Sequence, residues 1–377
     1  MRNHVPARPV ALLAALSLAV CLGGCGDNAL PSDQTATAED PVLSGEFAGS
    51  GASSQQSANE AWIAGFRALH PGARISYDPA GSGAGVNAFL NGSTIWAGTD
   101  APLTQAQLKS SESTCQGGRA FDIPVYATPI AVAYNLRSAG LNAVDRHLRL
   151  DPQTMAMIFD GGITNWNDAR IARLNPGVDL PDLDITVVHR SDKSGTTKSF
   201  LSYLHDTAGS AWPHPAGENW PNDLGQAAKG TAGVVMTLNQ AEGTIGYADA
   251  AQTTGLGTVA VKAGSSYTPP TTAAAGKALE AAGFDSAARG AGRLVLKVDH
   301  AGAGEGTYPI LLVSYDVACQ VYRRDPDHEK ARFAKEWLTY VIGEEGQEAA
   351  ARNAGSVRLG PSLRKRVMTS VEAMEVD

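Results

Sequence analysis

The sequence predicts an α/β fold with a mostly parallel β-sheet. Short apolar runs alternate with amphipathic stretches from Leu43 onward, several of the apolar runs end in Gly/Ser-rich loops, and no internal repeat is visible. Apolar runs that alternate with helical patterns are typical of strands joined by crossover helices, which place neighbouring strands in parallel. The 377 residues are enough for about two or three packed domains.

The amphipathic stretches are expected to be helices. Ala58, Trp62, Phe66 and Leu69 recur at the spacing of one helix face, and Pro71-Gly72 ends that run. Trp62 and Trp337 both fit helix patterns and are expected in the core. The 41 glycines suit short turns and close packing of helices on a sheet.

Three predicted strand-to-helix junctions share an unusual composition. The first runs through 49–54 (Gly-Ser-Gly-Ala-Ser-Ser), the second through 81–85 (Gly-Ser-Gly-Ala-Gly), and the third through 190–197 (Arg-Ser-Asp-Lys-Ser-Gly-Thr-Thr). Each offers Gly for close backbone approach, hydroxyl donors, and a helix N-terminus with free N–H groups. A fourth junction at 96–103 places Asp100 in the same structural position.

These junctions predict a binding site for an anion. In open α/β sheets, ligands collect beyond the carboxyl ends of the strands, where these loops must lie. Arg190 adds one fixed cation to hydroxyls and consecutive N–H groups, which matches the acceptor oxygens of an oxyanion. The alternative is that each loop is only a turn with a Ser or Thr cap, and this alternative weakens when three such loops occur together.

The first 25 residues carry a targeting signal. Arg2 and Arg8 precede an apolar stretch from Val10 to Leu22 that is too short to span a bilayer stably, and Leu-Gly-Gly-Cys follows at 22–25. This pattern resembles a bacterial lipobox, which implies removal of residues 1–24 and lipidation of Cys25. A plain secretory peptide is the alternative. Residues 25–42 are polar and predict a flexible tether that holds an exported body at the outer face of the cytoplasmic membrane.

The charge of the chain argues against a nucleic-acid partner. The formal net charge is −8, and loss of Arg2 and Arg8 would make it two units more negative. No basic run or stripe is present, so a nucleic-acid partner is not expected.

The cysteines predict one disulfide. Once Cys21 is removed with the signal peptide and Cys25 is lipidated, Cys115 and Cys319 remain. An oxidising compartment favours a disulfide between them over two buried thiols.

The motifs together resemble the periplasmic phosphate-binding proteins of bacterial phosphate ABC transporters. The resemblance covers most of the mature chain, and its motifs occur in the family's order. They are 49–54, 81–86, 98–103, 158–177 with Trp166, 190–196 and 243–247.

The resemblance implies a two-lobed periplasmic-binding-protein fold of type II with a two-strand hinge. Lobe 1 would comprise residues 43–130 and 307–377, and lobe 2 would be an insertion at 131–306. The chain would leave lobe 1 near 126–131 and return near 307–310. We expect a monomer whose partners are inorganic phosphate and the membrane permease subunits of an importer, and whose lobes close over the ligand.

The same resemblance implies which residues contact phosphate. Asp100 would accept a hydrogen bond, and Asp192 would hold Arg190 in orientation without touching the ligand. The phosphate-binding residues implied are Ser53, Ser54, Ser82, Asp100, Arg190, Ser194, Gly195 and Thr196.

Two loops depart from the commoner family pattern. Ser53-Ser54 stands where Thr-Phe is frequent, and Lys193 stands where Gly is frequent. Ser keeps the hydroxyl, and any residue other than Pro keeps the N–H donor. We expect Lys193 to strain a left-handed backbone, if the loop requires one there.

Asp100 turns an oxyanion site into a phosphate site. Phosphate at neutral pH carries at least one O–H that a carboxylate can accept, whereas sulfate carries none. Facing sulfate, Asp100 would leave buried lone pairs unpaired at a cost of roughly 1 to 3 kcal/mol. Selectivity would therefore come from rejection of ions that lack a proton.

The sequence supports an enzyme or a metal-binding protein less well than a phosphate receptor. Ser194 does not sit in a nucleophile elbow, because Asp192 occupies the position where Gly is needed. The eight histidines are scattered without metal-ligand spacing, so no metal, no cofactor and no catalytic residue is expected. A receptor for another oxyanion or a phosphorylated small molecule, and a phosphatase or adhesion protein, stay open. The loop from Trp212 to Trp220 has no predicted role.

Overall fold

The computed structural model describes residues 42–115, 118–143, 146–322 and 328–376. The predicted signal peptide, the lipidated Cys25 and tether residues 25–41 lie outside this part of the chain. Within it, no helix is long and apolar enough to cross a membrane.

Over the described residues, eleven strands form one sheet, whose main path runs β2-β1-β3-β13-β4-β8-β6-β7. Strands β5, β9 and β10 join it beside β4. The strands of this path are β1 (Ser44–Gly51), β2 (Gly72–Asp78), β3 (Trp96–Thr99), β4 (Ala120–Tyr134), β6 (Thr186–Arg190), β7 (Gln226–Ala228), β8 (Thr244–Asp249) and β13 (Leu311–Cys319). The others are β5 (Leu148–Leu150), β9 (Gly257–Ala263) and β10 (Ser266–Thr268), with β11 (Gly283–Phe284) and β12 (Leu296–Lys297) as a separate pair.

The parallel strands that the sequence predicts occur within each lobe. β1 pairs in parallel with β2 and β3, and β6 pairs in parallel with β7 and β8. β4 and β13 pair antiparallel with each other and with their other neighbours, so the sheet as a whole is mixed. The α/β class and the two-strand connection therefore hold, and the crossing strands supply the antiparallel part.

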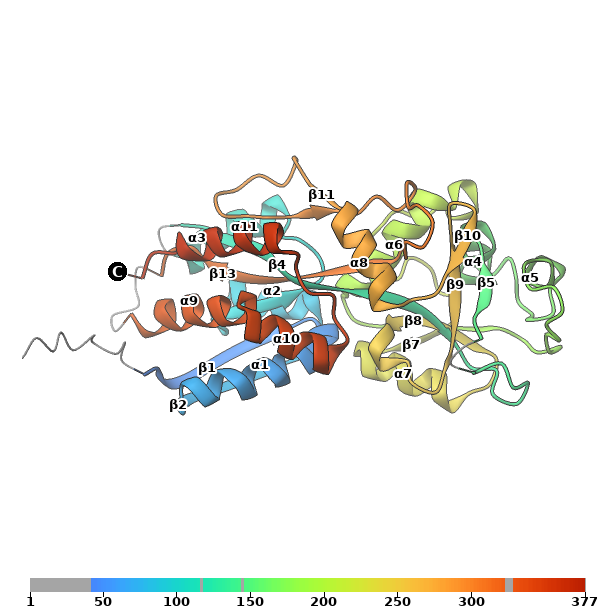
Figure 1. Ribbon diagram of the computed structural model, residues 1–377, viewed down its shortest axis with the longest axis horizontal. Coiled ribbons are helices and arrows are strands. Elements are labelled where there is room, and N and C mark those ends of the chain that lie inside the picture. The colour runs from blue at the N-terminus through green and yellow to red at the C-terminus, as the bar shows by residue number, and fades with distance from the viewer. Residues whose placement is uncertain (1–41, 116–117, 144–145, 323–327, 377) are drawn as a thin grey trace, which may run out of the picture. The chain divides into compact units, whose positions relative to one another are not determined.

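β4 and β13 connect the two halves of the molecule, as Figure 1 shows for β4. All residues of both strands are buried, which suits apolar runs that are covered on both faces. Their register shifts between Ser314 and Tyr315, opposite Pro124. Proline cannot donate to a ladder and is tolerated inside a sheet at such bulges.

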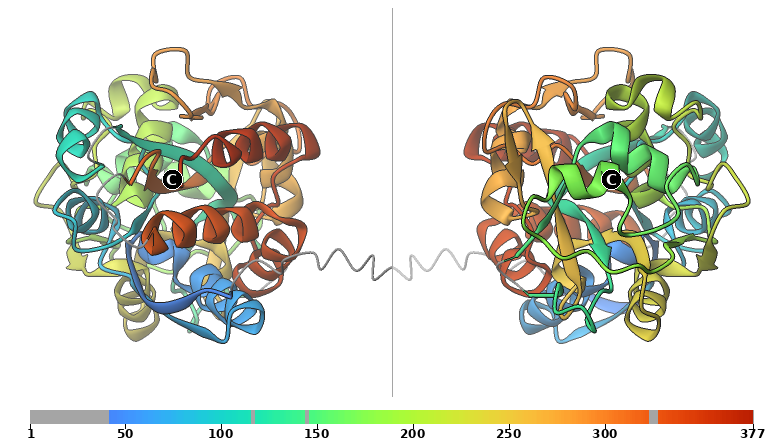
Figure 2. Two further views of the ribbon diagram at one scale, coloured as in Figure 1. Left: turned by 90° about the vertical axis from the view of Figure 1, so that its left-hand side faces the viewer. Right: turned by 90° about the vertical axis from the view of Figure 1, so that its right-hand side faces the viewer.

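Helices cover both faces of the sheet in each lobe (Figure 1). In lobe 1 they are α1 (Gln56–Leu69), α2 (Ser82–Leu90), α3 (Gln105–Thr114), α9 (Glu329–Ile342), α10 (Glu344–Ala354) and α11 (Pro361–Glu372). In lobe 2 they are α4 (Pro152–Phe159), α5 (Ala169–Leu174), α6 (Gly195–Thr207) and α7 (Gly230–Gln240), while α8 (Thr272–Ala281) packs against the crossing strands β4 and β13. Short 3-10 turns occur at η1 (Ser53–Gln55), η2 (Gly209–Ala211) and η3 (Ala250–Gln252). The red helices α9 and α11 pack together at the lobe 1 end (Figure 2, left).

Two main groups of buried side chains form the cores of the lobes. The first surrounds Trp62 and Trp337, whose indole rings meet edge to face at 6.4 Å, so both tryptophans are core residues as predicted. The second contains Trp166, whose Nε1 donates to the Gly243 carbonyl at 3.0 Å. Helix α8 contributes side chains to both cores. The lobe boundaries at residues 130 and 306 stay predictions.

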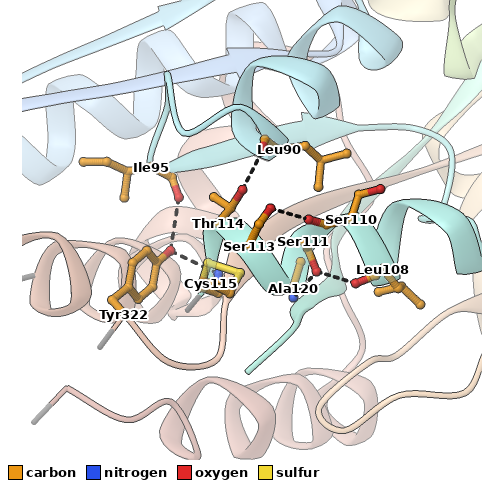
Figure 3. The surroundings of a disulfide bond; sticks show 11 residues. Leu90, Ile95, Leu108, Ser110, Ser111, Ser113, Thr114, Cys115, Ala120 and Tyr322 are labelled. Atoms are coloured by element: carbon orange, nitrogen blue, oxygen red, sulfur yellow. Dashed lines mark hydrogen bonds between the residues drawn. A yellow bond between two sulfur atoms is a disulfide. The ribbon is translucent and has the colours of Figure 1, made fainter. Parts of the chain in front are cut away.

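The predicted disulfide is present. Cys115 at the end of α3 and Cys319 at the end of β13 are joined with an S–S distance of 2.07 Å. Figure 3 shows Tyr322 beside the bridge, where its hydroxyl accepts from the Cys319 N–H at 3.1 Å and donates to the Ile95 carbonyl at 3.1 Å. The bridge closes a loop that contains all of the predicted lobe 2, residues 131–306.

Candidate functional site

The predicted loops follow the carboxyl ends of parallel strands and begin helices. Ser53 and Ser54 open η1 one residue after the end of β1, and Ser82 is the first residue of α2, after Gly81. Ser194 caps α6, where its side chain accepts from the Thr197 N–H at 3.2 Å. The starts of η1, α2 and α6 thereby meet around Ser82 and Asp100, and the positive ends of their dipoles face one region.

The structure brings lobe 1 and lobe 2 into contact at these residues. The Oγ of Ser82 accepts from two backbone N–H groups, those of Asp100 and Gly195, each at 3.2 Å. The Thr196 hydroxyl donates to Asp100 Oδ2 at 3.2 Å. Because Ser82 and Asp100 belong to lobe 1 and Gly195 and Thr196 to lobe 2, these bonds exist only when the lobes meet.

Asp100 is a buried carboxylate that three hydroxyl groups surround. Ser54 donates to Oδ2 and Ser314 to Oδ1, both at 2.6 Å, and Thr196 is the third donor. Burial raises the pKa of Asp100 above its ordinary value, while the hydrogen bonds from Ser314, Ser54 and Thr196 and the charge of Arg190 oppose that rise. The hydroxyl groups therefore support the ionised form in a site that otherwise disfavours it.

Arg190 and Asp192 form a buried, two-point ion pair. Arg190 Nε lies 2.8 Å from Asp192 Oδ1, and the second guanidinium contact to Oδ2 is 2.5 Å. The Arg190 side chain is only 2% exposed. Burial would raise the pKa of Asp192, but hydrogen bonds and charge from Arg190, together with the Gly230 N–H at 3.0 Å, outweigh it and lower the pKa. The geometry suits the orienting role predicted for Asp192.

Lys193 does not adopt the left-handed backbone that we considered for it. Among the described residues, the only non-glycine with positive φ is His328. The Lys193 carbonyl accepts from the Gly83 N–H at 3.1 Å, across the lobes. A β-carbon on Gly83 would lie 2.5 Å from Cδ of Lys193, so the lysine stem covers the start of α2. The ammonium group lies 3.5 Å from Glu218.

The loop from Trp212 to Trp220 packs against the Arg190 loop and the strand that precedes it. Trp220 stacks on His189 with ring centroids 4.9 Å apart and on Tyr247 at 5.9 Å. The Ser194 N–H donates to the Glu218 carbonyl at 2.9 Å. This loop therefore supports the shape of the Arg190 loop, and His189 is a packing residue whose Nδ1 lies 3.0 Å from the Arg190 carbonyl oxygen.

Two residues at the site were missed by sequence reasoning. Ser314 is one serine in the apolar run of β13, and Thr231 follows Gly230 at the start of α7. No local pattern marks either residue, because each contacts the site through long-range packing. Within the described residues, no group of three or more His, Cys, Asp or Glu side chains is arranged to hold a metal ion.

Residues 35–345 match the family described as the PBP superfamily domain. The chain is 34% identical to phosphate-binding protein PstS 2 of Mycobacterium tuberculosis, over 97% of each chain. It is 30% identical to phosphate-binding protein PstS of Methanocaldococcus jannaschii, over 97% of this chain and 93% of the other.

Solved structures share the fold. A high affinity periplasmic phosphate-binding protein (PfluDING) bound with phosphate has a TM-score of 0.66 and 20% identity, over 86% of this chain and 93% of the other. The ancestral soluble variant of the human phosphate binding protein has a TM-score of 0.66 and 20% identity, over 88% of this chain and 99% of the other. The two-lobed periplasmic-binding fold is thus common to all of them.

Proposed function

The chain belongs to the PBP superfamily, within its PstS-type phosphate-binding proteins, and from that premise we propose that it captures inorganic phosphate and delivers it to an ABC importer. The relatives named above support the function, and the residues of this chain support the ligand. We propose Ser53, Ser54, Ser82, Asp100, Arg190, Ser194, Gly195 and Thr196 as the phosphate contacts.

The observation that carries the proposal is that Arg190 and Asp100 are both buried at the same site, close enough for the charge of Arg190 to lower the pKa of Asp100. Arg190 and the N-termini of η1, α2 and α6 supply positive potential for an anion. Besides the positions that Ser54, Ser314 and Thr196 fill, Asp100 offers a further acceptor position, to which a protonated oxyanion can donate. Buried anions need many aligned donors, and the loops provide them from both lobes.

Capture follows from closure of the lobes. The bonds from Gly195 to Ser82 and from Thr196 to Asp100 join the lobes in the closed form. Phosphate would favour this form, because it contacts donors of both lobes there and of one lobe when they are apart. The closed shape is then the signal that permease subunits recognise.

Calorimetry on residues 43–377 with phosphate, arsenate and sulfate tests the ligand. We expect tight binding of phosphate and no measurable heat with sulfate. Equal binding of sulfate would instead indicate a receptor for another oxyanion, and binding only of a phosphorylated small molecule would indicate a receptor for that compound. Release of phosphate from a phosphate ester, abolished by Ser194→Ala, would show an enzyme instead.

We propose further that the exported protein is a monomer anchored at the outer face of the cytoplasmic membrane through lipidated Cys25. The lipobox-like Leu-Gly-Gly-Cys at 22–25 supports this. Mass spectrometry of the mature N-terminus tests it, since a diacylglyceryl group on Cys25 is expected. Cys25→Ser should release the protein from membranes, and an unchanged membrane fraction would contradict the anchor.

A further inference from the structure

The first turn of α7 contacts both halves of the candidate site. The Thr231 N–H donates to the Ser53 hydroxyl oxygen at 3.0 Å, and the two hydroxyl oxygens lie 3.1 Å apart. The neighbouring Gly230 N–H donates to Asp192 Oδ1 at 3.0 Å. One helix start in lobe 2 therefore holds Ser53 of lobe 1 and the partner of Arg190.

These contacts take the place of a local helix cap. The N-cap residue Lys229 makes no side-chain cap, so the first N–H groups of α7 need other acceptors. Ser53 and Asp192 supply them. Gly230 has φ +68°, a backbone conformation that favours glycine, and it directs the first N–H groups of α7 toward Asp192 and Ser53.

A hydroxyl oxygen can accept two hydrogen bonds and donate one. At Ser82 the two acceptor positions are filled by the N–H groups of Asp100 and Gly195, which leaves its proton for a ligand. At Ser53 the N–H of Thr231 fills one position, and the Thr231 hydroxyl is placed to fill the second.

We propose that Thr231 is a positioning residue for phosphate, which directs the Ser53 hydroxyl proton toward the ligand. This inference rests on the proposed function. Either oxygen can donate in the 3.1 Å contact between the two hydroxyls. When Thr231 donates, both acceptor positions of Ser53 are occupied, its proton is free for the anion, and a chain of donors runs from Thr231 through Ser53. Such chains strengthen each member in a buried site, and Thr231 is 2% exposed.

The same contact couples the hydroxyl orientation to closure. Ser53 and Thr231 lie 178 residues apart in different lobes, so Ser53 is oriented only when the lobes meet. Loss of the Thr231 hydroxyl should therefore act mainly on escape of the ligand from the closed form, seen as a faster dissociation rate.

Thr231→Val tests the proposal, because it keeps the shape and the N–H but removes the hydroxyl. We expect phosphate Kd to rise roughly threefold to tenfold, the range of one net hydrogen bond, mostly through the dissociation rate in stopped-flow. Thr231→Ser, which keeps the hydroxyl, should bind phosphate with an affinity close to that of wild type. The control is Thr237→Val on the same helix, whose hydroxyl donates to the Gly233 carbonyl at 2.9 Å, and it should bind as wild type.

A Ser53→Ala background separates positioning from packing. There Thr231→Val should change Kd by less than about twofold, because the hydroxyl it orients is gone. A full effect in that background, wild-type affinity of Thr231→Val, or equal weakening by Thr237→Val would each overturn the inference.

Circular dichroism and the melting temperature establish folding, and Thr231→Ala replaces Thr231→Val if the latter is unfolded. Failure of wild-type protein to bind phosphate would instead refute the proposed function, so the two failures differ.

Discussion

Gly195 lies so close to Asp100 that a β-carbon at position 195 would come within 2.7 Å of the Asp100 β-carbon. Real β-carbon contacts do not reach that distance, so one lobe would have to move away from the other. Glycine at this position therefore decides whether the lobes can close, in addition to offering its N–H to Ser82.

Gly195→Ala should weaken phosphate binding by about fivefold or more without unfolding the protein. Overpacking of this size costs typically about 1 to 3 kcal/mol, and here the open form avoids it. Calorimetry measures the affinity and thermal unfolding measures the fold. Gly217→Ala is the matched control, since a β-carbon there meets nothing within 4 Å. Wild-type affinity of Gly195→Ala would contradict the closed arrangement.

Ser314→Ala should make phosphate binding more sensitive to acid. The Ser314 hydroxyl opposes the rise in the pKa of Asp100 that burial causes, so its loss raises that pKa further. Asp100 must be ionised to accept the ligand O–H, and the affinity of the variant should therefore begin to fall at a higher pH than in wild type.

The measurement is phosphate Kd between pH 5 and pH 8. Ser356→Ala serves as a control, because it also removes a buried hydroxyl, one with no hydrogen-bond partner among the described residues. Superimposable pH profiles of Ser314→Ala and wild type would show that Ser314 does not act through Asp100.

The four site loops could be predicted because their signals are local. Three of these loops are rich in Gly, Ser or Thr within a few residues of a strand end, one of them carries Arg190, and a helix N-terminus follows each of the three. Ser314 and Thr231 could not be predicted in this way. They reach Asp100 and Ser53 across 214 and 178 residues of chain, and a single hydroxyl in an apolar strand or a helix start carries no pattern.

The α/β class was predictable for the same reason, whereas the two crossing strands were expected from the family resemblance and not from the local pattern. Alternation of apolar runs with helical faces predicts the parallel strands of each lobe. Antiparallel pairing of β4 with β13 joins segments about 190 residues apart along the chain, and Pro124 within β4 would argue against a central strand. The bulge at Ser314 and Tyr315 accommodates the proline, and this bulge can be seen in the structure but not in the sequence.

The double variant Cys115→Ala/Cys319→Ala should lose stability and keep its affinity. Closure of a loop across 204 residues removes entropy from the unfolded chain, and native disulfides contribute about 2 to 5 kcal/mol. Cys319 is five residues beyond Ser314 on β13, roughly 16 Å at the rise of a strand. Urea unfolding and phosphate calorimetry check both parts, and wild-type protein with reductant is a second test. Weaker binding by a folded double variant would show that the bridge also shapes the site.

Asp316→Asn should flatten the pH dependence of stability. Burial raises the pKa of Asp316 to about 7, in spite of the opposing side chains of Gln55 and Trp337, whereas the unfolded value is about 3.9. The native state then binds more protons between these two values, so the free energy of unfolding falls as pH rises through that window.

Removal of this titration should reduce the loss of stability between pH 5 and pH 8 by ~1–3 kcal/mol. Urea unfolding at both pH values measures it. Asp223→Asn, at an exposed position, is the control and should leave the slope unchanged. An equal slope for Asp316→Asn and wild type would place the titration on other groups, among them Asp249, whose pKa burial also raises to about 7.

Asp100→Asn should relax the discrimination between phosphate and sulfate. The carboxylate accepts a ligand O–H but repels an oxygen without a proton, whereas a carboxamide can donate to that oxygen. Sulfate rejection, worth roughly 1 to 3 kcal/mol per unpaired group, should therefore weaken by about fivefold or more, while phosphate binding loses its charge-assisted bond.

Competition of sulfate against phosphate in the folded variant measures this ratio. Asp78→Asn, an exposed residue at the end of β2, removes the same charge away from the site and should leave the ratio unchanged. If Asp100→Asn rejected sulfate as strongly as wild type, selectivity would have to arise from the donors around Arg190. The acceptor that separates the two anions would then not be Asp100.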